Sequence, residues 1–509
     1  MHNDEDSGGS GAANGPLTRS TYKGLQWTYL ASAVGGVLQL GYTAIMGRLL
    51  TPTDFGVLAI AIVFLRFGQY FAQMGVGPAL VQSPRMSDLK ISTAFRMNVA
   101  LSATVAAVFV ASASLSTLML DEPVVVPVVR VMALSLIIGG LGTTAESLLR
   151  RNLEFRRLAI NQLTSFITGY VVIGISAALL GAGVWSLVAA SLSQAAINVI
   201  LNVHAYRHPV RAGWSSKDAR TLISFGGRVS IIGFTEFLGS SLDTMLIGRV
   251  AGGASLGQYN RAFLIVNLPL ERLMQGVQRV LFPALSRIQD QRERLARVYR
   301  SSLAIAGAIL IPTGAGMALA AAPIVRVVLG DQWNESARVL PFLALSAALN
   351  LLALLGAIVC EATADLNRKL ALQSVHVVAL FGLLVVAGSD LRNLALAVML
   401  AQVIRVLGYF AFMRRTLDVD LLEHFRVLLP SIVTGTIIAG AGYSWNYLFA
   451  STMPAGMLLS IHVASGAACL LASLRFGPLS TVRRDLAVWL HQAGALERLP
   501  KRLRQLTGT

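Results

Sequence analysis

The chain has 509 residues, of which 55% are hydrophobic and only 13% are charged, and its mean hydropathy is +0.65. Soluble domains carry about 25% charged residues, so a chain of this composition has too few charged side chains to cover a water-exposed surface. Its composition suits a lipid bilayer. The net charge of +17 does not indicate nucleic-acid binding, because the basic residues form short clusters between apolar runs instead of one patch. Such clusters are typical of the cytoplasmic loops of membrane proteins.

The N-terminal segment is polar, acidic and rich in glycine and serine. It reads MHNDEDSGGSGAANGP and has no basic region followed by an apolar core, so it is not a signal peptide. We expect residues 1–23 to form a disordered cytoplasmic tail. Near the other end, residues 476–509 mix apolar and basic side chains, which is typical either of an amphipathic helix on an anionic membrane or of a solvated tail.

Apolar runs long enough to cross a bilayer follow one another through the rest of the chain. A spanning helix needs roughly 20 mostly apolar residues, so the sequence predicts an all-α polytopic membrane protein with about fourteen transmembrane helices. The predicted helices cover residues 25–47, 56–81, 97–118, 124–145, 160–180, 184–206, 225–248, 259–283, 301–322, 337–360, 369–388, 391–413, 428–449 and 455–475.

The placement of the basic residues tests this helix count independently. If the N-terminus is cytoplasmic, most of the 42 lysines and arginines fall in loops or tails that face the cytoplasm. Inward clusters include Arg150, Arg151, Arg156 and Arg157, then Arg207, Arg211, Lys217 and Arg220, and later Arg414, Arg415 and Arg426. Outside lie Arg48, Arg130, Arg249, Arg261, Arg326, Arg338 and Arg392. This bias predicts that both termini are cytoplasmic.

A short motif occurs twice in the chain. Met46-Gly47-Arg48-Leu49, followed by Phe55-Gly56, recurs as Ile247-Gly248-Arg249-Val250, followed by Leu256-Gly257, and the numbering of the copies differs by 201. An even number of predicted helices separates the copies, so both have the same orientation. The repeat therefore predicts two six-helix lobes related by a pseudo-two-fold axis along the membrane normal, with two further helices at the C-terminal end.

The predicted divisions follow from this repeat. They are a tail at 1–23, an N-lobe at 24–206 (helices one to six), a cytoplasmic linker at 207–224, a C-lobe at 225–413 (helices seven to twelve), helices thirteen and fourteen at 414–475, and a basic cytoplasmic tail at 476–509.

Three of the predicted helices carry polar residues on one face. The sets are Arg66, Gln69 and Gln73 in the second helix; Glu236, Ser240 and Asp243 in the seventh; and Asn267, Glu271, Gln275 and Gln278, with Arg272 beside them, in the eighth. These spacings place each set on one side of its helix. An ionisable group costs roughly 2.5–3.5 kcal/mol at the bilayer centre, so each face is expected to point at protein or water.

Two interpretations of these charges stay open. In the first, they line a pathway for a substrate or an ion, and Pro269 breaks the hydrogen-bond ladder of the eighth helix one turn from Glu271, which frees the carbonyl of Ile265 for a cation or a hydroxyl. Alternatively, Glu271 and Asp243 only neutralise Arg272 and Arg66 inside the bundle. Three other intramembrane polar residues are interpreted as structural: Arg279, His376 and Arg405.

Motifs of common enzyme classes are absent from the sequence. No Gly-x-x-x-x-Gly-Lys-Ser/Thr string occurs, so no ATP-binding P-loop drives transport here. No His-Glu-x-x-His or Cys-x-x-Cys metal motif and no Gly-x-Ser-x-Gly nucleophile elbow occur either. The predicted outer loops are too short to hold a catalytic domain. We therefore expect a carrier that is not an enzyme and uses neither a cofactor nor a metal.

Several motifs, in order, carry a resemblance to a known family. They are GRLLTPTDFGVLAIA, MGVGPALVQ, RNLEFRR, GAGVWSLV, LDTMLIGRVAGGASLGQYNRA, NLP, RVLFPALSR and LGDQW, all within residues 24–345. In these the chain resembles the polysaccharide-export branch of the multidrug/oligosaccharidyl-lipid/polysaccharide superfamily, the bacterial flippases of lipopolysaccharide and exopolysaccharide biosynthesis. The resemblance implies a central cavity lined by the first, second, seventh and eighth helices, alternating access, and a place in the bacterial cytoplasmic membrane.

The resemblance also implies a substrate, undecaprenyl-diphosphate-linked oligosaccharide, moved from the inner to the outer leaflet. Because a lipid diphosphate is anionic, arginines are candidate phosphate partners. The candidate substrate-binding residues are Arg66, Gln69, Gln73, Arg272, Gln275, and at the outer mouth Arg48 and Arg249. The candidate ion-coupling residues are Asp243, Glu271 and Glu236. Expected partners are membrane lipids, a polysaccharide polymerase and a chain-length regulator, and no nucleic acid.

Two other functions compete with this one. A multidrug or cation antiporter of the same superfamily would have a cavity rich in acidic and aromatic residues, which Arg66 and Arg272 disfavour. A membrane-bound polysaccharide polymerase or acyltransferase would need a long outer loop with paired basic or His/carboxylate residues, which the sequence lacks. A polar cavity between the lobes would separate a carrier from both an enzyme and a scaffold.

Overall fold

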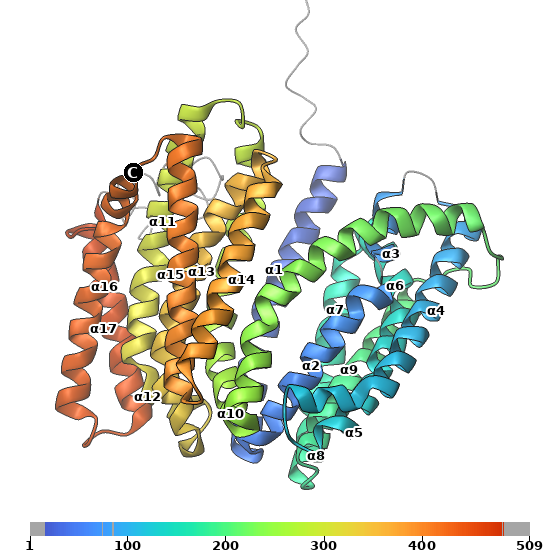
Figure 1. The fold of residues 1–509 in the computed structure, drawn as a ribbon, viewed down its shortest axis with the longest axis horizontal. Helices are drawn as coiled ribbons and strands as arrows, with labels where there is room; N and C mark the ends of the chain where they lie inside the picture. Colours follow the sequence, from blue (N-terminus) through green and yellow to red (C-terminus); the bar gives the residue numbers. More distant parts are fainter. Residues whose placement is uncertain (1–15, 74, 84–85, 481, 483–509) are drawn as a thin grey trace, which may run out of the picture. The chain divides into compact units, whose positions relative to one another are not determined.

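The computed structural model describes residues 16–73, 75–83, 86–480 and 482, without the side chains of residues 16–26, 28–29, 225–236, 272–280 and 283. Over this part of the chain every regular element is a helix (Figure 1). In a bilayer a helix satisfies its own backbone hydrogen bonds, which an open strand cannot do. The predicted all-α membrane fold is confirmed.

Within the described residues, 12 segments are long and apolar enough to cross a membrane. A further helix, α10 (Ser216–Ser286), covers both predicted helices between residues 225 and 283, and Gly252, with a φ of 81°, interrupts it between them. The number fourteen stays a prediction, whereas a multi-pass membrane protein is confirmed.

The helices divide into two compact units. Unit 1 comprises residues up to Leu49, Ile60–Leu118 and Glu122–Phe237. Its elements are α1 (Pro16–Leu49), most of α2 (Pro52–Gln73), α3 (Val76–Gln82), α4 (Asp88–Ser112), η2 (Ala113–Leu118), α5 (Val125–Met132), α6 (Leu134–Arg151), α7 (Phe155–Phe166), the π-helix η3 (Ile167–Gly174), α8 (Ile175–Leu179), α9 (Val184–Ala205) and the start of α10.

The core of unit 1 is built around α6. This helix packs on α3, α4 and α9, which lie beside it in Figure 1. A second apolar cluster joins α3 and α4 to the start of α10 through Leu80, Met97 and Leu222. Arg151 at the end of α6 donates to the carbonyl oxygen of Val81 at 2.9 Å and so caps the last turn of α3.

Unit 2 comprises Leu50–Ala59, Met119–Asp121 and the residues from Leu238 onward. Its elements are the first turns of α2, the rest of α10, α11 (Arg292–Leu319), α12 (Ala321–Val328), η4 (Asp331–Trp333), α13 (Asn334–Ala362), α14 (Leu366–Ala387), α15 (Leu391–Leu417), α16 (Leu421–Phe449) and α17 (Ala455–Arg475). Helix α11 packs on α13 and α16, and α15 packs on α13 and α14.

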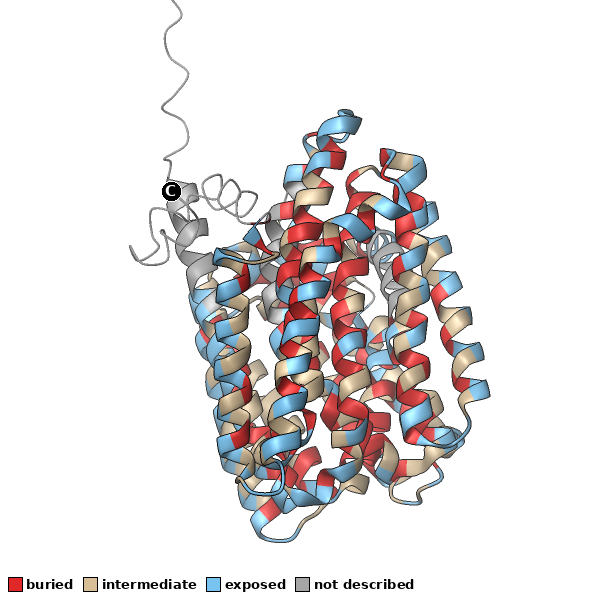
Figure 2. Cartoon of the chain, turned by 90° about the vertical axis from the view of Figure 1, so that its left-hand side faces the viewer, coloured by how far each residue is buried: buried red, intermediate tan, exposed pale blue. Residues whose placement is uncertain are grey.

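Burial identifies the centre of unit 2. In α13, 72% of the most apolar window is buried, against 17% in α14 and in α17. In Figure 2 exposed and buried residues alternate around the helices, so that single helices carry both kinds on different sides. The exposed faces carry large apolar side chains such as Val386 and Tyr447, which suits contact with lipid.

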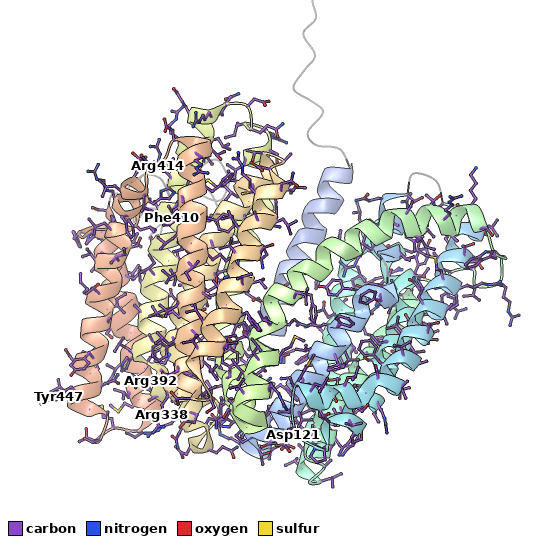
Figure 3. The ribbon with its side chains drawn as sticks, viewed as in Figure 1. Asp121, Arg338, Arg392, Phe410, Arg414 and Tyr447 are labelled. Atoms are coloured by element: carbon purple, nitrogen blue, oxygen red, sulfur yellow. The ribbon has the colours of Figure 1, made fainter. Side chains whose placement is uncertain are left out.

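Figure 3 relates the ends of unit 2 to the predicted charge distribution. Arg338 and Arg392, predicted to be outside, lie at one end of the helices, and Arg414, predicted to be inside, lies toward the other end. The structure thus separates the two sets of arginines along the helix axes. Which end faces the cytoplasm stays a prediction.

Three expected boundaries differ from the helix bounds in the structure. The tail expected at 1–23 is helical from Pro16, because a proline suits the first position of a helix; residues 1–15 lie outside the described part. The linker expected at 207–224 is helical from Ser216, where the Ser215 hydroxyl accepts a hydrogen bond from the Asp218 amide. The helix expected at 56–81 is divided near Gly75, whose φ of 62° is left-handed.

Two further expectations concern the C-terminal end and Pro269. Of the tail expected at 476–509, residues 481 and 483–509 lie outside the described part. The backbone of α10 stays helical at Pro269, so this proline, which has no N–H to donate, interrupts the hydrogen-bond ladder without ending the helix.

The packing of α13 on α15 generates a prediction about stability. A Cβ on Gly356 would lie 2.7 Å from Cδ1 and 2.9 Å from Cβ of Tyr409. We expect Gly356→Ala to lower the free energy of unfolding by about 1–3 kcal/mol through overpacking, measured as a lower Tm in detergent. Gly382→Ala in α14 is the matched control, because nothing lies within 4 Å of its Cβ position. Equal Tm values for the two variants would contradict this packing.

Candidate functional site

The parts of the two motif copies around Gly56 and around Gly257 pack directly against each other in unit 2. A Cβ on Gly56 would lie 2.0 Å from the carbonyl oxygen of Gly253, and a Cβ on Gly257 would lie 1.8 Å from the carbonyl oxygen of Pro52. The repeat offset of 201 relates Gly56 to Gly257 and also Pro52 to Gly253. The two contacts are therefore symmetry equivalents, and both require a residue without a side chain.

A third segment, residues 331–336, joins these two copies. The Gln258 side chain donates to the carbonyl oxygen of Gln332 at 3.1 Å and accepts from the amide of Ser336 at 2.9 Å. The Gln332 side chain donates to the carbonyl oxygen of Leu50 at 3.0 Å. One glutamine thus holds the second motif copy to this segment, and another holds the segment to the first copy.

An aromatic contact completes the arrangement. The ring of Phe55 lies 5.5 Å from the ring of Trp333, and the guanidinium of Arg261 lies 4.3 Å from the Phe55 ring centroid. Phe55, Trp333 and Arg261 are all buried, and a desolvated cation–π contact stabilises by up to about 2 kcal/mol. We call the whole set the outer cluster: Leu50, Pro52, Phe55, Gly56, Gly253, Gly257, Gln258, Arg261, Gln332, Trp333 and Ser336.

Asp243 lies on α10 close to this cluster in sequence, and it is buried. One carboxylate oxygen accepts from the Tyr259 hydroxyl at 2.6 Å, and the other accepts from the Thr244 amide at 2.7 Å. These donors are neutral; the side chain of Arg272, an expected counterion, lies outside the described residues. The Asp243–Tyr259 bond joins the two parts of α10 on either side of Gly252.

The predicted stripe on α2 belongs to unit 1. Arg66, Gln69 and Gln73 are all exposed, although they lie in a segment with a mean hydropathy of 1.8. Phe67 and Phe71 beside them are 38% and 47% exposed, and their ring centroids lie 5.3 Å apart. The stripe therefore presents a guanidinium and two amides next to an aromatic surface.

The remaining predicted site residues are either exposed or outside the described side chains. Arg48 and Arg249, equivalent positions of the repeat, are both exposed, and Arg48 donates to the carbonyl oxygen of Ala44 in its own helix at 2.9 Å. Glu271 is exposed in unit 2. The side chains of three other candidates lie outside the described residues: Glu236, Arg272 and Gln275.

A known protein family matches the part of the chain that contains these residues. The profile of a family described as "Polysaccharide biosynthesis protein" matches residues 45–338. That range contains the α2 stripe, both copies of the repeated motif and the segment 331–336. The chain belongs to this polysaccharide biosynthesis family. The resemblance inferred from the sequence motifs is confirmed.

Curated relatives extend the match over most of the chain. The lipopolysaccharide biosynthesis protein WzxC of Escherichia coli is 24% identical, over 82% of this chain and 87% of its own length. The teichuronic acid biosynthesis protein TuaB of Bacillus subtilis is 23% identical, over 89% and 95%. The succinoglycan biosynthesis transport protein ExoT of Rhizobium meliloti is 27% identical, over 64% and 66%.

Solved structures share the fold. The lipid II flippase MurJ in an inward closed conformation has a TM-score of 0.71 at 14% identity, covering 91% of this chain and 99% of that one. An inward-facing multidrug transporter of the MATE family, a member of the MOP superfamily, has a TM-score of 0.56 at 14% identity, covering 75% and 94%. The chain thus shares its fold with these two transporters.

Sequence reasoning missed most of the outer cluster. It selected exposed or intramembrane charges, whereas Gln258, Gln332 and Ser336 are neutral residues near helix ends. A signal was present, because the strings GRLLTPTDFG, SLGQYNRA and LGDQW are among the motifs that carry the family resemblance. In this family member those three strings meet in space.

The reciprocal glycine contacts generate a prediction about the outer cluster. We expect Gly56→Ala and Gly257→Ala each to force the two motif copies apart, because the new methyl group would overlap a backbone carbonyl oxygen that no rotamer change can move. Cysteines placed at Thr53 and Ala254, with Cys360 and Cys469 replaced by alanine, report the separation. Cross-linking by a short bismaleimide should slow several-fold in both variants.

The matched control for this experiment is Gly440→Ala in α16, because nothing lies within 4 Å of its Cβ position. Its cross-linking rate should equal that of the parent protein. Unchanged rates in Gly56→Ala and Gly257→Ala would show that the two motif copies do not pack closely in the membrane.

Proposed function

We propose that this protein is a flippase that moves undecaprenyl-diphosphate-linked oligosaccharide, a polysaccharide repeat unit, from the inner to the outer leaflet of a bacterial cytoplasmic membrane. The family membership supports a role in polysaccharide biosynthesis. The relatives from three bacteria act in lipopolysaccharide, teichuronic acid and succinoglycan biosynthesis by name, and the fold is shared with a lipid II flippase. We also propose that both termini face the cytoplasm, because basic clusters favour that side of the membrane.

The exposed stripe on α2 is the observation that carries the proposal. An arginine in an apolar span is costly unless it meets water, protein or an anion. Arg66 offers the planar donor fork that binds phosphate oxygens in pairs, and Gln69 and Gln73 offer amides for sugar hydroxyls. We assign Arg272 and Gln275 on α10 the corresponding roles, and Arg48 and Arg249 the release of the diphosphate on the outer side.

Transport by alternating access requires the outer cluster to open. Separation of the two motif copies breaks the glycine contacts and the hydrogen bonds of Gln258 and Gln332. Because glycine has no side chain, little apolar surface becomes exposed where the glycines separate. These contacts therefore suit a seal that forms and breaks repeatedly. The Gln258 and Gln332 side chains would rebind water in the open state.

The driving ion is assigned to α10. Asp243 is held by Tyr259 across Gly252, so a proton or sodium ion on this carboxylate changes a bond that joins the two parts of the helix. Glu271 and Glu236 are proposed to act with it. The proposal assigns the protein no catalytic reaction and no cofactor. A polysaccharide polymerase and a chain-length regulator are its proposed partners.

Removal of the Arg66 guanidinium tests the proposal. In cells lacking this gene, we expect undecaprenyl-diphosphate-linked oligosaccharide to accumulate on the inner leaflet and the wild-type protein to relieve the accumulation. Arg66→Ala should lower transport about tenfold or more, because hydrogen bonds to a charged group contribute about 1.5–3 kcal/mol. Arg66→Lys keeps the charge but loses the fork, so it should restore transport only in part.

Arg338→Ala is the matched control, because Arg338 is an exposed arginine that pairs only with Glu335 one turn away in the described structure. It should transport like the wild type. Full transport by Arg66→Ala at equal membrane abundance would remove Arg66 from the site. No accumulation in the deletion strain, together with altered drug sensitivity, would instead favour a multidrug antiporter.

A further inference from the structure

A cavity of about 640 Å³ lies in unit 1, and no residue of the α2 stripe lines it. It runs along α9 beside α6, and one wall is apolar, formed by Leu141, Val199, Ile200 and Val203. Ile200 is 64% exposed and Leu141 is 39% exposed. Both positions lie within spanning segments, so this wall faces hydrocarbon.

The other end of the cavity is basic. It is lined by His204 in the last turn of α9 and by Arg207 and His208 just after the helix. The carbonyl end of a helix repels anions, but Arg157 donates to the last carbonyl oxygen of α9, that of Ala205, at 3.3 Å. The cavity thus combines an apolar wall with a cationic mouth at the predicted cytoplasmic end of the helices.

The segment that carries this mouth is held in place by α4. The Ser92 hydroxyl donates to the carbonyl oxygens of Val210 and Gly213 at 3.1 and 3.0 Å, and the Ser215 amide donates to the Thr93 hydroxyl at 2.9 Å. Ser92 and Thr93 are both fully buried. Buried hydrogen bonds of this kind are costly to break, so Arg207 and His208 are carried on a fixed segment.

His208 is half-buried beside α4 at the rim of the cavity. Its ring lies 5.2 Å from the ring of Phe95, and both of its ring nitrogens are buried. Burial lowers the pKa of His208, and a weaker hydrogen bond to the Pro209 backbone raises it. Burial therefore disfavours the charged form of His208, and Arg207 supplies the permanent positive charge at the mouth.

We propose that this cavity binds an anionic phospholipid of the cytoplasmic leaflet, with its phosphate at Arg207 and an acyl chain along the apolar wall of α9. A soluble phosphate would leave that wall without a partner, whereas a zwitterionic lipid carries a cation that Arg207 repels. Basic pockets between helices at the cytoplasmic side bind anionic headgroups in this way.

Lipid binding to the purified full-length protein tests this proposal. Native mass spectrometry measures the phosphatidylglycerol that stays bound as the lipid is titrated, with phosphatidylcholine as the comparison lipid. Arg207→Ala should weaken binding of phosphatidylglycerol at this site about fivefold. Ile200→Trp should also weaken phosphatidylglycerol binding, because the larger side chain fills the space along the apolar wall. This variant keeps every charge. Neither change should alter phosphatidylcholine binding.

Arg211→Ala is the matched control, because Arg211 is exposed on the same segment but does not line the cavity. It should bind phosphatidylglycerol like the wild type, and glycerol 3-phosphate should not compete. Wild-type binding by both Arg207→Ala and Ile200→Trp, or an equal loss in Arg211→Ala, would overturn the proposal. Displacement of phosphatidylglycerol by stoichiometric undecaprenyl phosphate would also overturn it, by assigning the cavity to the prenyl carrier.

Discussion

The close approach of two backbones at Gly56 and Gly257 is the constraint on which the outer cluster depends. At both positions the neighbouring carbonyl oxygen lies where a Cβ would be, so only glycine permits the contact. Once the two motif copies are this close, Gln258 and Gln332 can join them through residues 331–336, and Phe55 can lie between Arg261 and Trp333. Each copy of the sequence motif therefore makes the equivalent glycine contact with the other copy.

The apolar bilayer makes each polar group within a spanning segment costly, so the surroundings of each group indicate its role. With so few charged residues available, each one in a span stands out against an apolar background. Asp243 is buried and held by two neutral donors, whereas Arg66 is exposed on a helix of high hydropathy. The first arrangement suits a group that changes protonation or binds a small ion, and the second suits a group that meets a large anionic ligand.

Hydropathy and charge placement predicted the all-helical membrane fold, because both follow from the free energy of moving residues between water and lipid. The repeat at Gly56 and Gly257 predicted related halves of the chain, but not that the copies touch, since contact depends on tertiary packing. The hydrogen bond from Tyr259 to Asp243 was not predicted. This neutral donor lies 16 residues later, across the turn at Gly252, and charge spacing alone does not reveal it.

The α2 stripe illustrates what a helical period can and cannot predict. The spacing of Arg66, Gln69 and Gln73 placed them on one face, and the structure leaves all three exposed. The break near Gly75 just beyond them was missed, because a glycine inside an apolar run is equally compatible with a continuous helix and with a left-handed turn. Neutral residues such as Gln258 were missed for a related reason, since their role arises only from what packs against them.

Transport by the purified protein alone tests the central claim most directly. The protein would be reconstituted into liposomes with a fluorescent undecaprenyl-diphosphate oligosaccharide, and the fraction of label accessible to a membrane-impermeant quencher would be followed over time. The account predicts transfer between leaflets that is much faster than in protein-free liposomes and that Arg66→Ala slows. Transfer at the protein-free rate, with rapid movement of an organic cation in the same vesicles, would contradict it.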